Sequence, residues 1–178
     1  MIERNEKMNL YDQLLSLQEI PNAYRLWTEY RENLTEYIIK QLEGEPQSVL
    51  ILGGGRSNDI DLKRLMPYVT HLTLWDKDEK AIHEARLKYD LVDNPKVSIV
   101  REDLLGIAAN DYRIYAEALV QTVRKKGMNT SLEELSVVAR TGIQKLEQKI
   151  SVVDFKEKQY DTIIMIGLHS QLFSMMDW

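Results

Sequence analysis

The stretch Ser48-Val49-Leu50-Ile51-Leu52-Gly53-Gly54-Gly55 decides the fold of this 178-residue chain. A short, continuous apolar run that meets glycines at once is typical of a strand buried on both faces of a parallel sheet. Working outward from it, the pattern predicts a helix over residues 58–66, with Asn58 as its N-cap, and then a strand over 71–75. Further strands follow at 97–100 and 162–166. Strands that alternate with helices in this way indicate a parallel sheet with right-handed crossovers.

Two helical segments lie outside this alternation. Residues 1–47 are predicted as an N-terminal helical arm, because apolar residues recur at helical spacing up to Gly44 and Pro46. Residues from about 109 to 150 are predicted as an inserted helical hairpin, in which Ser131-Leu132-Glu133-Glu134 fits a capping box. We therefore expect the arm (1–47) and a Rossmann-like α/β core (48–178) that carries the insertion and has helices on both faces of its sheet.

Composition excludes several classes of protein. Apolar residues make up 44% of the chain and the formal net charge is −5, which disfavours non-specific binding to nucleic acid or to an anionic membrane. The chain contains no cysteine, so disulfides, thiolate metal sites and cysteine nucleophiles are excluded. No apolar run approaches the roughly 20 residues of a membrane helix, and no signal peptide is visible. The expectation is a cytoplasmic protein without a nucleic-acid or membrane partner.

Three features fall where strands are predicted to end. Gly53-Gly54-Gly55 follows the first strand, Asp76 closes the second and Asp103 follows the third. Ligands of parallel α/β sheets bind beyond the carboxyl ends of the strands, where glycines allow close approach and an acidic residue can hold both ribose hydroxyls. Each feature alone also fits a tight turn, a cap or a solvated loop. Together they favour a nucleoside-shaped ligand, with Asp103 near an adenine amino group.

The glycine spacing discriminates between nucleotides. The dinucleotide pattern G-x-G-x-x-G would need a third glycine where the chain has Asn58, whereas Gly53, Gly55 and Ser57 fit G-x-G-x-G/S. An NAD-dependent enzyme, which would use the same Asp76, therefore remains an alternative with an incomplete motif.

At this point the chain resembles the class I S-adenosylmethionine-dependent methyltransferases. The resemblance covers roughly residues 48–167 and rests on the order and spacing of four motifs. They are Val49-Leu50-Ile51-Leu52-Gly53-Gly54-Gly55-Arg56-Ser57, Leu74-Trp75-Asp76-Lys77-Asp78, Arg101-Glu102-Asp103-Leu104 and Tyr160-Asp161-Thr162-Ile163-Ile164-Met165. It implies a sheet in the order 3-2-1-4, S-adenosylmethionine as cofactor, and methyl transfer to an acceptor that the sequence does not identify.

The resemblance also implies roles for individual residues. Asp76 would hold the ribose hydroxyls, and Lys77 would lie against the adenine by its backbone and aliphatic stem. Asp103 would accept from the adenine amino group, Leu104 would donate its backbone N–H to the ring, and Gly167 would border the methyl-transfer site. The full implied cofactor-binding set is Gly53, Gly54, Gly55, Ser57, Asp76, Lys77, Asp103, Leu104 and Gly167.

The chain departs from the family at two places. Many members carry an acidic residue in the first strand, where this chain has Ile51, and the hold on the methionine amino group would then be weaker. After the fourth strand the chain has Gly167-Leu168-His169-Ser170-Gln171 in place of an Asn-Pro-Pro-type motif, which argues against the enzymes that methylate adenine or glutamine amino groups. Methyl transfer is an in-line displacement that needs positioning more than proton transfer. His169 is the candidate general base, and a loop or helix-cap histidine is the alternative.

The family usually continues with further strands, whereas this chain ends soon after the fourth. Residues 162–166 would then form a sheet edge with unpaired backbone groups. Either the chain is the N-terminal, cofactor-binding portion of a longer methyltransferase, or a partner covers this edge. A non-catalytic interaction module is therefore a further alternative, with a possible homodimer through the fourth strand or through the helical insertion.

Overall fold

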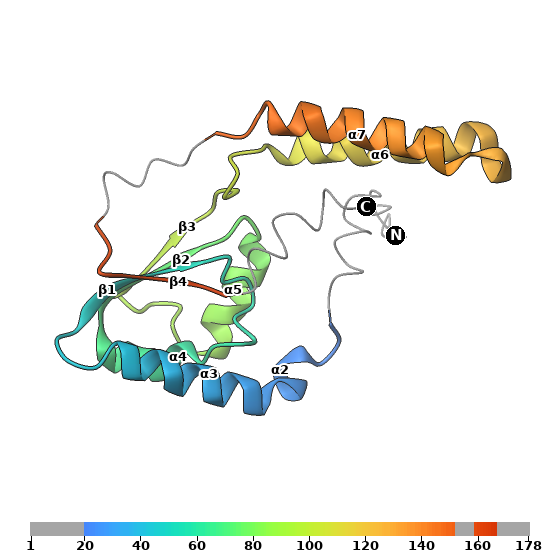
Figure 1. Cartoon of the computed structure of the whole chain (residues 1–178). Helices are drawn as coiled ribbons and strands as arrows, with labels where there is room; N and C mark the ends of the chain where they lie inside the picture. Colours follow the sequence, from blue (N-terminus) through green and yellow to red (C-terminus); the bar gives the residue numbers. More distant parts are fainter. Residues whose placement is uncertain (1–19, 152–158, 167–178) are drawn as a thin grey trace, which may run out of the picture. The chain divides into compact units, whose positions relative to one another are not determined.

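The computed structural model describes residues 20–151 and 159–166 of the chain. Four strands form one sheet in the order β3-β2-β1-β4, and every neighbouring pair is parallel (Figure 1). The predicted Rossmann-like α/β class and strand order are confirmed. The strands are β1 (Gln47–Leu52), β2 (Val69–Trp75), β3 (Val97–Val100) and β4 (Thr162–Met165).

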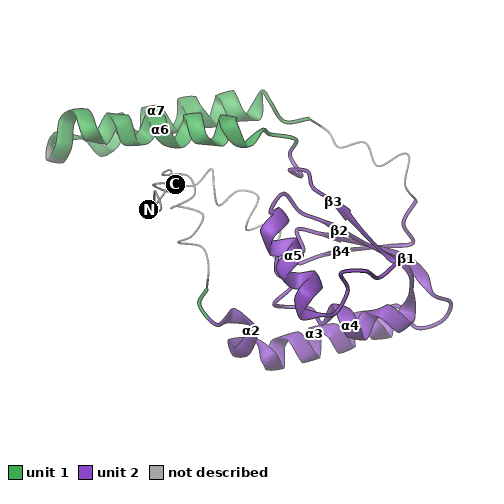
Figure 2. Cartoon of the chain, turned by 180° about the vertical axis from the view of Figure 1, so that it is seen from behind, with its two compact units in different colours: residues 1–21, 106–151, 175–178 green, residues 22–105, 152–174 purple. Residues whose placement is uncertain are grey.

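Two compact units divide the described residues (Figure 2). One contains residues 22–105 and 159–166, with the whole sheet, and we call it the sheet unit. The other contains residues 20–21 and 106–151 and consists mainly of two helices, and we call it the hairpin unit.

The main apolar cluster of the sheet unit lies on one face of the sheet. Side chains alternate between the two faces of a strand, so Val49 and Ile51 of β1 lie on the same face as Leu72 and Leu74 of β2. These residues form one buried cluster with apolar side chains of three helices. The three helices are α3 (Thr28–Gln41), α4 (Leu62–Leu65) and α5 (Glu79–Lys88), and the short helix α2 (Ala23–Leu26) precedes them.

The helix after β1 begins later than the sequence predicts. Its N-cap is Asp61, whose side chain accepts a hydrogen bond from the Arg64 backbone N–H at 3.1 Å, and the predicted N-cap Asn58 is wrong. Asn58 instead remains in the loop, because its backbone carbonyl and its side-chain oxygen accept hydrogen bonds from Arg31 and Lys88. A 3-10 turn, η1 (Met66–Tyr68), links α4 to β2.

Helix α5 has well-defined ends. The side chain of Asp78 caps its first turn by accepting from the Ala81 N–H at 2.9 Å. At the other end Asp90 adopts a left-handed φ of 60°. The Leu91 N–H then bonds to the Arg86 carbonyl at 2.8 Å, and the Asp90 N–H bonds to the Leu87 carbonyl at 3.3 Å. This pair of bonds is a Schellman motif, in which the left-handed position is usually glycine.

The hairpin unit contains α6 (Ala109–Lys126), the 3-10 turn η2 (Gly127–Asn129) and α7 (Leu132–Glu147). Ser131 and Glu134 form the predicted capping box at the start of α7. The two helices approach closely where the Tyr115 ring packs over Gly142, since a Cβ at position 142 would overlap that ring. No helix within the described part of the chain is both long and apolar enough to cross a bilayer.

Candidate functional site

The glycine loop, residues 53–58, turns at the carboxyl end of β1. Gly53 and Gly55 have positive φ values of 66° and 44°, which glycine adopts at low steric cost. The Gly53 N–H donates to the carbonyl of Trp75, the last residue of β2, at 2.8 Å. The loop is therefore attached to the end of the neighbouring strand.

Asp76 joins the glycine loop to the turn after β2. One carboxylate oxygen, Oδ2, accepts from the Gly55 N–H at 2.8 Å, and Oδ1 accepts from the Asp78 N–H at 2.9 Å. Burial raises the pKa of Asp76, and the two backbone hydrogen bonds oppose that rise. A carboxylate has about four acceptor positions, so two of them remain for donors of a ligand.

Asp103 lies close to the turn after β2, as its ion pair with Lys77 of that turn shows. Lys77 Nζ lies 3.2 Å from Asp103 Oδ2, and Oδ1 accepts from the Leu105 N–H at 2.9 Å. The Asp103 side chain is only 13% exposed. The Asp76 N–H also donates to the Val100 carbonyl at 3.1 Å, which holds the end of β2 against the end of β3. The structure thus brings together Asp76, Lys77 and Asp103 at the carboxyl edge of the sheet.

The other predicted residues differ in their surroundings. Ser57 is buried and left-handed, with φ 46°, and its hydroxyl donates to the Gly54 carbonyl at 3.0 Å. Ile51 lies beneath the loop, because a Cβ on Gly54 would lie 3.3 Å from Ile51 Cγ2. Leu104 is half-buried next to Asp103. The predicted Gly167 and His169 lie outside the described residues.

Asp161, which belongs to the fourth motif, lies away from the candidate site. Asp161 precedes β4 and exchanges hydrogen bonds with the backbone of Ser48, near the start of β1. This is the amino end of the parallel sheet, opposite the glycine loop, so Asp161 fixes the β1–β4 pairing and takes no part in the candidate site.

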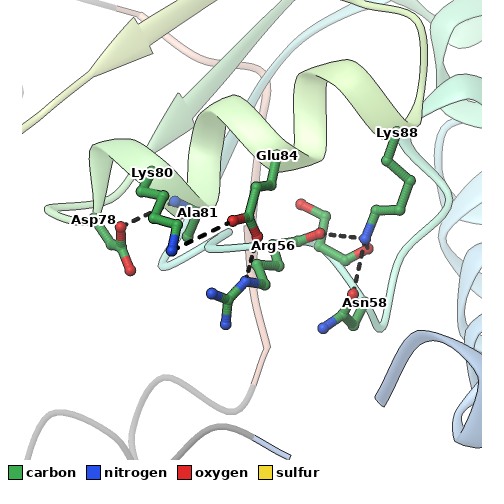
Figure 3. Close-up of polar contacts among 8 residues, drawn as sticks. Arg56, Asn58, Asp78, Lys80, Ala81, Glu84 and Lys88 are labelled. Atoms are coloured by element: carbon green, nitrogen blue, oxygen red, sulfur yellow. Dashed lines mark hydrogen bonds and ion pairs between the residues drawn. The ribbon is translucent and has the colours of Figure 1, made fainter. Parts of the chain in front are cut away.

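Sequence reasoning missed the residues that hold the second half of the glycine loop. Arg56 Nε donates to Glu84 Oε2 at 2.5 Å, and Lys88 Nζ donates to the Arg56 carbonyl at 2.5 Å and to Asn58 Oδ1 at 2.8 Å (Figure 3). Glu84 and Lys88 lie on one side of α5, roughly 30 residues further along the chain. No sequence pattern links such charged residues to a distant loop, because the contact depends on how α5 packs.

Known proteins resemble this chain only weakly. No family model matches the chain, and no curated protein matches it. One solved structure that matches is a candidate methyltransferase from Bacillus halodurans, with 16% sequence identity. The match covers 48% of this chain and 44% of that chain, less than half of its length, with a TM-score of 0.34. A likeness of that size carries no argument about function, so the assignment depends on the site itself.

Proposed function

We propose that the chain binds S-adenosylmethionine at the carboxyl ends of β1, β2 and β3 and acts as a methyltransferase, or as the cofactor-binding portion of one. The observation that carries the proposal is the placement of Asp76, whose carboxylate bonds to the glycine loop and keeps acceptor positions for a ligand. A ribose offers two adjacent hydroxyl donors, and one carboxylate can accept both.

The neighbouring groups fit the base of an adenosine. Asp103 supplies a second carboxylate, which suits the donor N–H groups of an adenine amino group. Lys77 Nζ pairs with Asp103, and in this proposal the aliphatic stem of Lys77 offers an apolar surface to the base. In this proposal Gly53, Gly54 and Gly55 face the methionine part, Gly167 borders the transferred methyl group, and His169 would remove a proton from the acceptor.

The start of α4 disfavours a dinucleotide. In dinucleotide-binding folds the pyrophosphate lies at the N-terminus of the helix that follows the glycine loop. Here that helix has only four residues, and the carboxylate of Asp61 already caps it. A negative side chain at a helix N-terminus repels a pyrophosphate. An NAD-dependent enzyme is therefore the weaker alternative.

Calorimetric titration with S-adenosylhomocysteine tests the proposal. We expect wild-type protein to bind it, and Asp76→Asn to bind about 10- to 100-fold more weakly, since a hydrogen bond to a charged group contributes about 1.5–3 kcal/mol. Asp93→Asn is the matched control, because Asp93 is exposed and lies after α5. Absence of heat at saturating ligand, or tighter binding of NADH than of S-adenosylhomocysteine, would refute the assignment.

A second candidate function is a protein-pairing surface on β4. Ile163 and Met165 point to the same face of this strand and are 55% and 61% exposed. Among the described strands β4 pairs only with β1, so it is an edge of the sheet that these strands form. If two copies pair through this edge, Ile163→Lys should convert a dimer to a monomer in light scattering. The exposed Val137 of α7 allows the comparison, because Val137→Lys should dissociate a dimer formed through the hairpin instead.

A further inference from the structure

Side chains from two helices hold the carbonyls of the glycine loop. Lys88 Nζ donates to the Arg56 carbonyl at 2.5 Å, and the Tyr89 hydroxyl donates to the Ser57 carbonyl at 2.7 Å. Arg31 of α3 donates to the Asn58 carbonyl at 3.0 Å. Three consecutive peptide groups are thus held from the side of the helices, and Figure 3 shows the Lys88 contacts.

These contacts determine the shape of the turn that contains Gly55. Because a peptide group is planar and trans, fixing the Arg56 carbonyl also fixes the direction of the Ser57 N–H. That N–H donates to the Gly54 carbonyl at 2.7 Å and closes a turn around Gly55. The Gly55 N–H in turn bonds to Asp76. A line of bonded groups therefore runs from Lys88 to the carboxylate that would hold the ribose.

The holding groups are themselves fixed by aromatic rings. The Arg31 guanidinium lies 3.8 Å from the centre of the Tyr24 ring, and Lys88 Nζ lies 4.6 Å from the same centre. The rings of Tyr24 and Tyr89 meet edge to face, with their centres 6.4 Å apart. Arg31 is only 6% exposed, and a buried cation kept against a ring has little freedom to leave the loop.

Ser57 explains why the loop needs this support. It is a buried non-glycine residue with a left-handed φ of 46°, a conformation that persists only where its surroundings over-determine it. Its carbonyl is held by Tyr89, and its N–H and hydroxyl both bond to Gly54. If the neighbouring carbonyls were released, this residue would be expected to relax and the turn around Gly55 would open.

We propose that Lys88, Tyr89 and Arg31 are positioning residues that keep the glycine loop in its ligand-binding shape before the ligand arrives. The proposal rests on the proposed function, since it concerns the same site. When only a fraction of molecules has the competent shape, the apparent affinity falls by that fraction. Loss of one holding group should therefore weaken ligand binding although none of the three is proposed to touch the ligand.

Protonation of Lys88 should modulate this hold. Burial and the nearby Arg31 lower the pKa of Lys88 to about 8, whereas the carboxylates of Asp59 and Glu84 act in the opposite direction. A neutral amine makes weaker hydrogen bonds to carbonyls than an ammonium does. The loop should therefore be held less firmly above pH 8. The titratable and charged groups that face Lys88 are Tyr24, Arg31, Arg56, Asp59, Glu84 and Tyr89.

The experiment follows the loop and the ligand separately. In the ligand-free protein, the backbone amide resonances of Ser57 and Asn58 should shift with pH near 8, and this shift should be absent in Lys88→Met. Binding of S-adenosylhomocysteine should be about tenfold weaker in Lys88→Met and Tyr89→Phe than in wild type. Lys88→Arg, which keeps the charge, should restore most of the affinity and lose the pH dependence. Lys40→Met is the matched control, because Lys40 is an exposed lysine near the end of α3.

The outcomes separate the two proposals. If wild-type protein binds no S-adenosylhomocysteine but its loop amides respond to Lys88→Met and to pH, the cofactor assignment fails and the positioning role stands. If Lys88→Met and Tyr89→Phe leave both the loop resonances and the affinity unchanged, the positioning role is overturned. If Lys88→Met does not fold, the comparison of Tyr89→Phe and Lys88→Arg with wild type decides in the same way.

Discussion

Replacing Gly55 by alanine tests the site through a single methyl group. Gly55 has a φ of 44°, and a Cβ added there would lie 3.6 Å from Asp76 Oδ2, which is ordinary van der Waals contact. The ligand-free protein therefore has room for the methyl group, and only backbone strain should change its free energy of unfolding. A left-handed conformation costs an L-residue about 1–2 kcal/mol, and alanine regains about 0.4–1 kcal/mol because it restricts the unfolded chain. The free energy of unfolding should fall by about 1 kcal/mol.

Ligand binding should be affected more strongly than stability. The added methyl group would lie beside Oδ2, one of the two oxygens proposed to accept from the ribose hydroxyls. We expect the affinity for S-adenosylhomocysteine to fall by at least about tenfold, which is 1.4 kcal/mol of binding free energy. Calorimetry measures the affinity, and urea denaturation followed by circular dichroism measures the stability.

Gly44→Ala is the control for strain without a ligand effect. Gly44 has a φ of 120° and no atom within 4 Å of an added Cβ, and it lies between α3 and β1. Alanine there should reduce stability by at least as much as at Gly55 and leave the affinity unchanged. If folded Gly55→Ala binds S-adenosylhomocysteine as tightly as wild type, the ligand does not lie where we place it.

Three further substitutions test the structure by thermal and urea denaturation of the whole chain. Asp90→Gly should raise the free energy of unfolding by about 0.5–1 kcal/mol, because Asp90 has a φ of 60° that glycine adopts at low steric cost. If Asp90→Ala were as stable as Asp90→Gly, this reason would be contradicted. Gly142→Ala should reduce the free energy of unfolding of the wild-type protein by about 1–3 kcal/mol, because the added methyl group overlaps Tyr115. In the Tyr115→Ala protein, where the ring is gone, the same Gly142→Ala change should instead raise the free energy of unfolding by about 1 kcal/mol. The lowered pKa of Lys88 means that the unfolded chain holds more protons between pH 8 and 10.5. The difference in free energy of unfolding between wild type and Lys88→Met should therefore shift in favour of wild type as the pH rises across that window. If this difference did not change with pH, the Lys88 ammonium would not be destabilised by burial.

The central strands of the sheet could be predicted from the sequence because both of their faces are buried, with Leu50 and Thr73 on one face and Ile51 and Leu74 on the other. Strand β3 spans the predicted residues 97–100, and β1, β2 and β4 differ from their predicted bounds by at most two residues at either end. In such strands a continuous apolar run is the physical requirement, and it is visible in one dimension. The capping box of α7 was equally readable, because both of its partners lie within four residues of each other.

The glycine loop could be predicted only in part. Its position after β1 and its distance from Asp76 follow from the strand pattern, but the late start of α4 does not. A local pattern favours Asn58 as an N-cap, and it is overruled by hydrogen bonds from Arg31 and Lys88, which lie 27 and 30 residues away in sequence. Lys88 itself, at the end of a helix, is also the residue type that the helix dipole favours there. Its second role appears only when α5 is packed against the loop.

The two sets of contacts on the glycine loop differ in what they leave for a ligand. Carbonyls of the loop are taken up by Lys88, Tyr89 and Arg31, and this side faces the helices. On the other side Asp76 accepts one N–H at each oxygen and retains acceptor positions. A loop fixed on its helix side and unsaturated on its sheet-edge side can bind donors without rearranging. Such preorganisation reduces the ordering cost of binding, and under the proposed function it would explain why strain at Ser57 and the burial of Arg31 are maintained beside a loop of six residues.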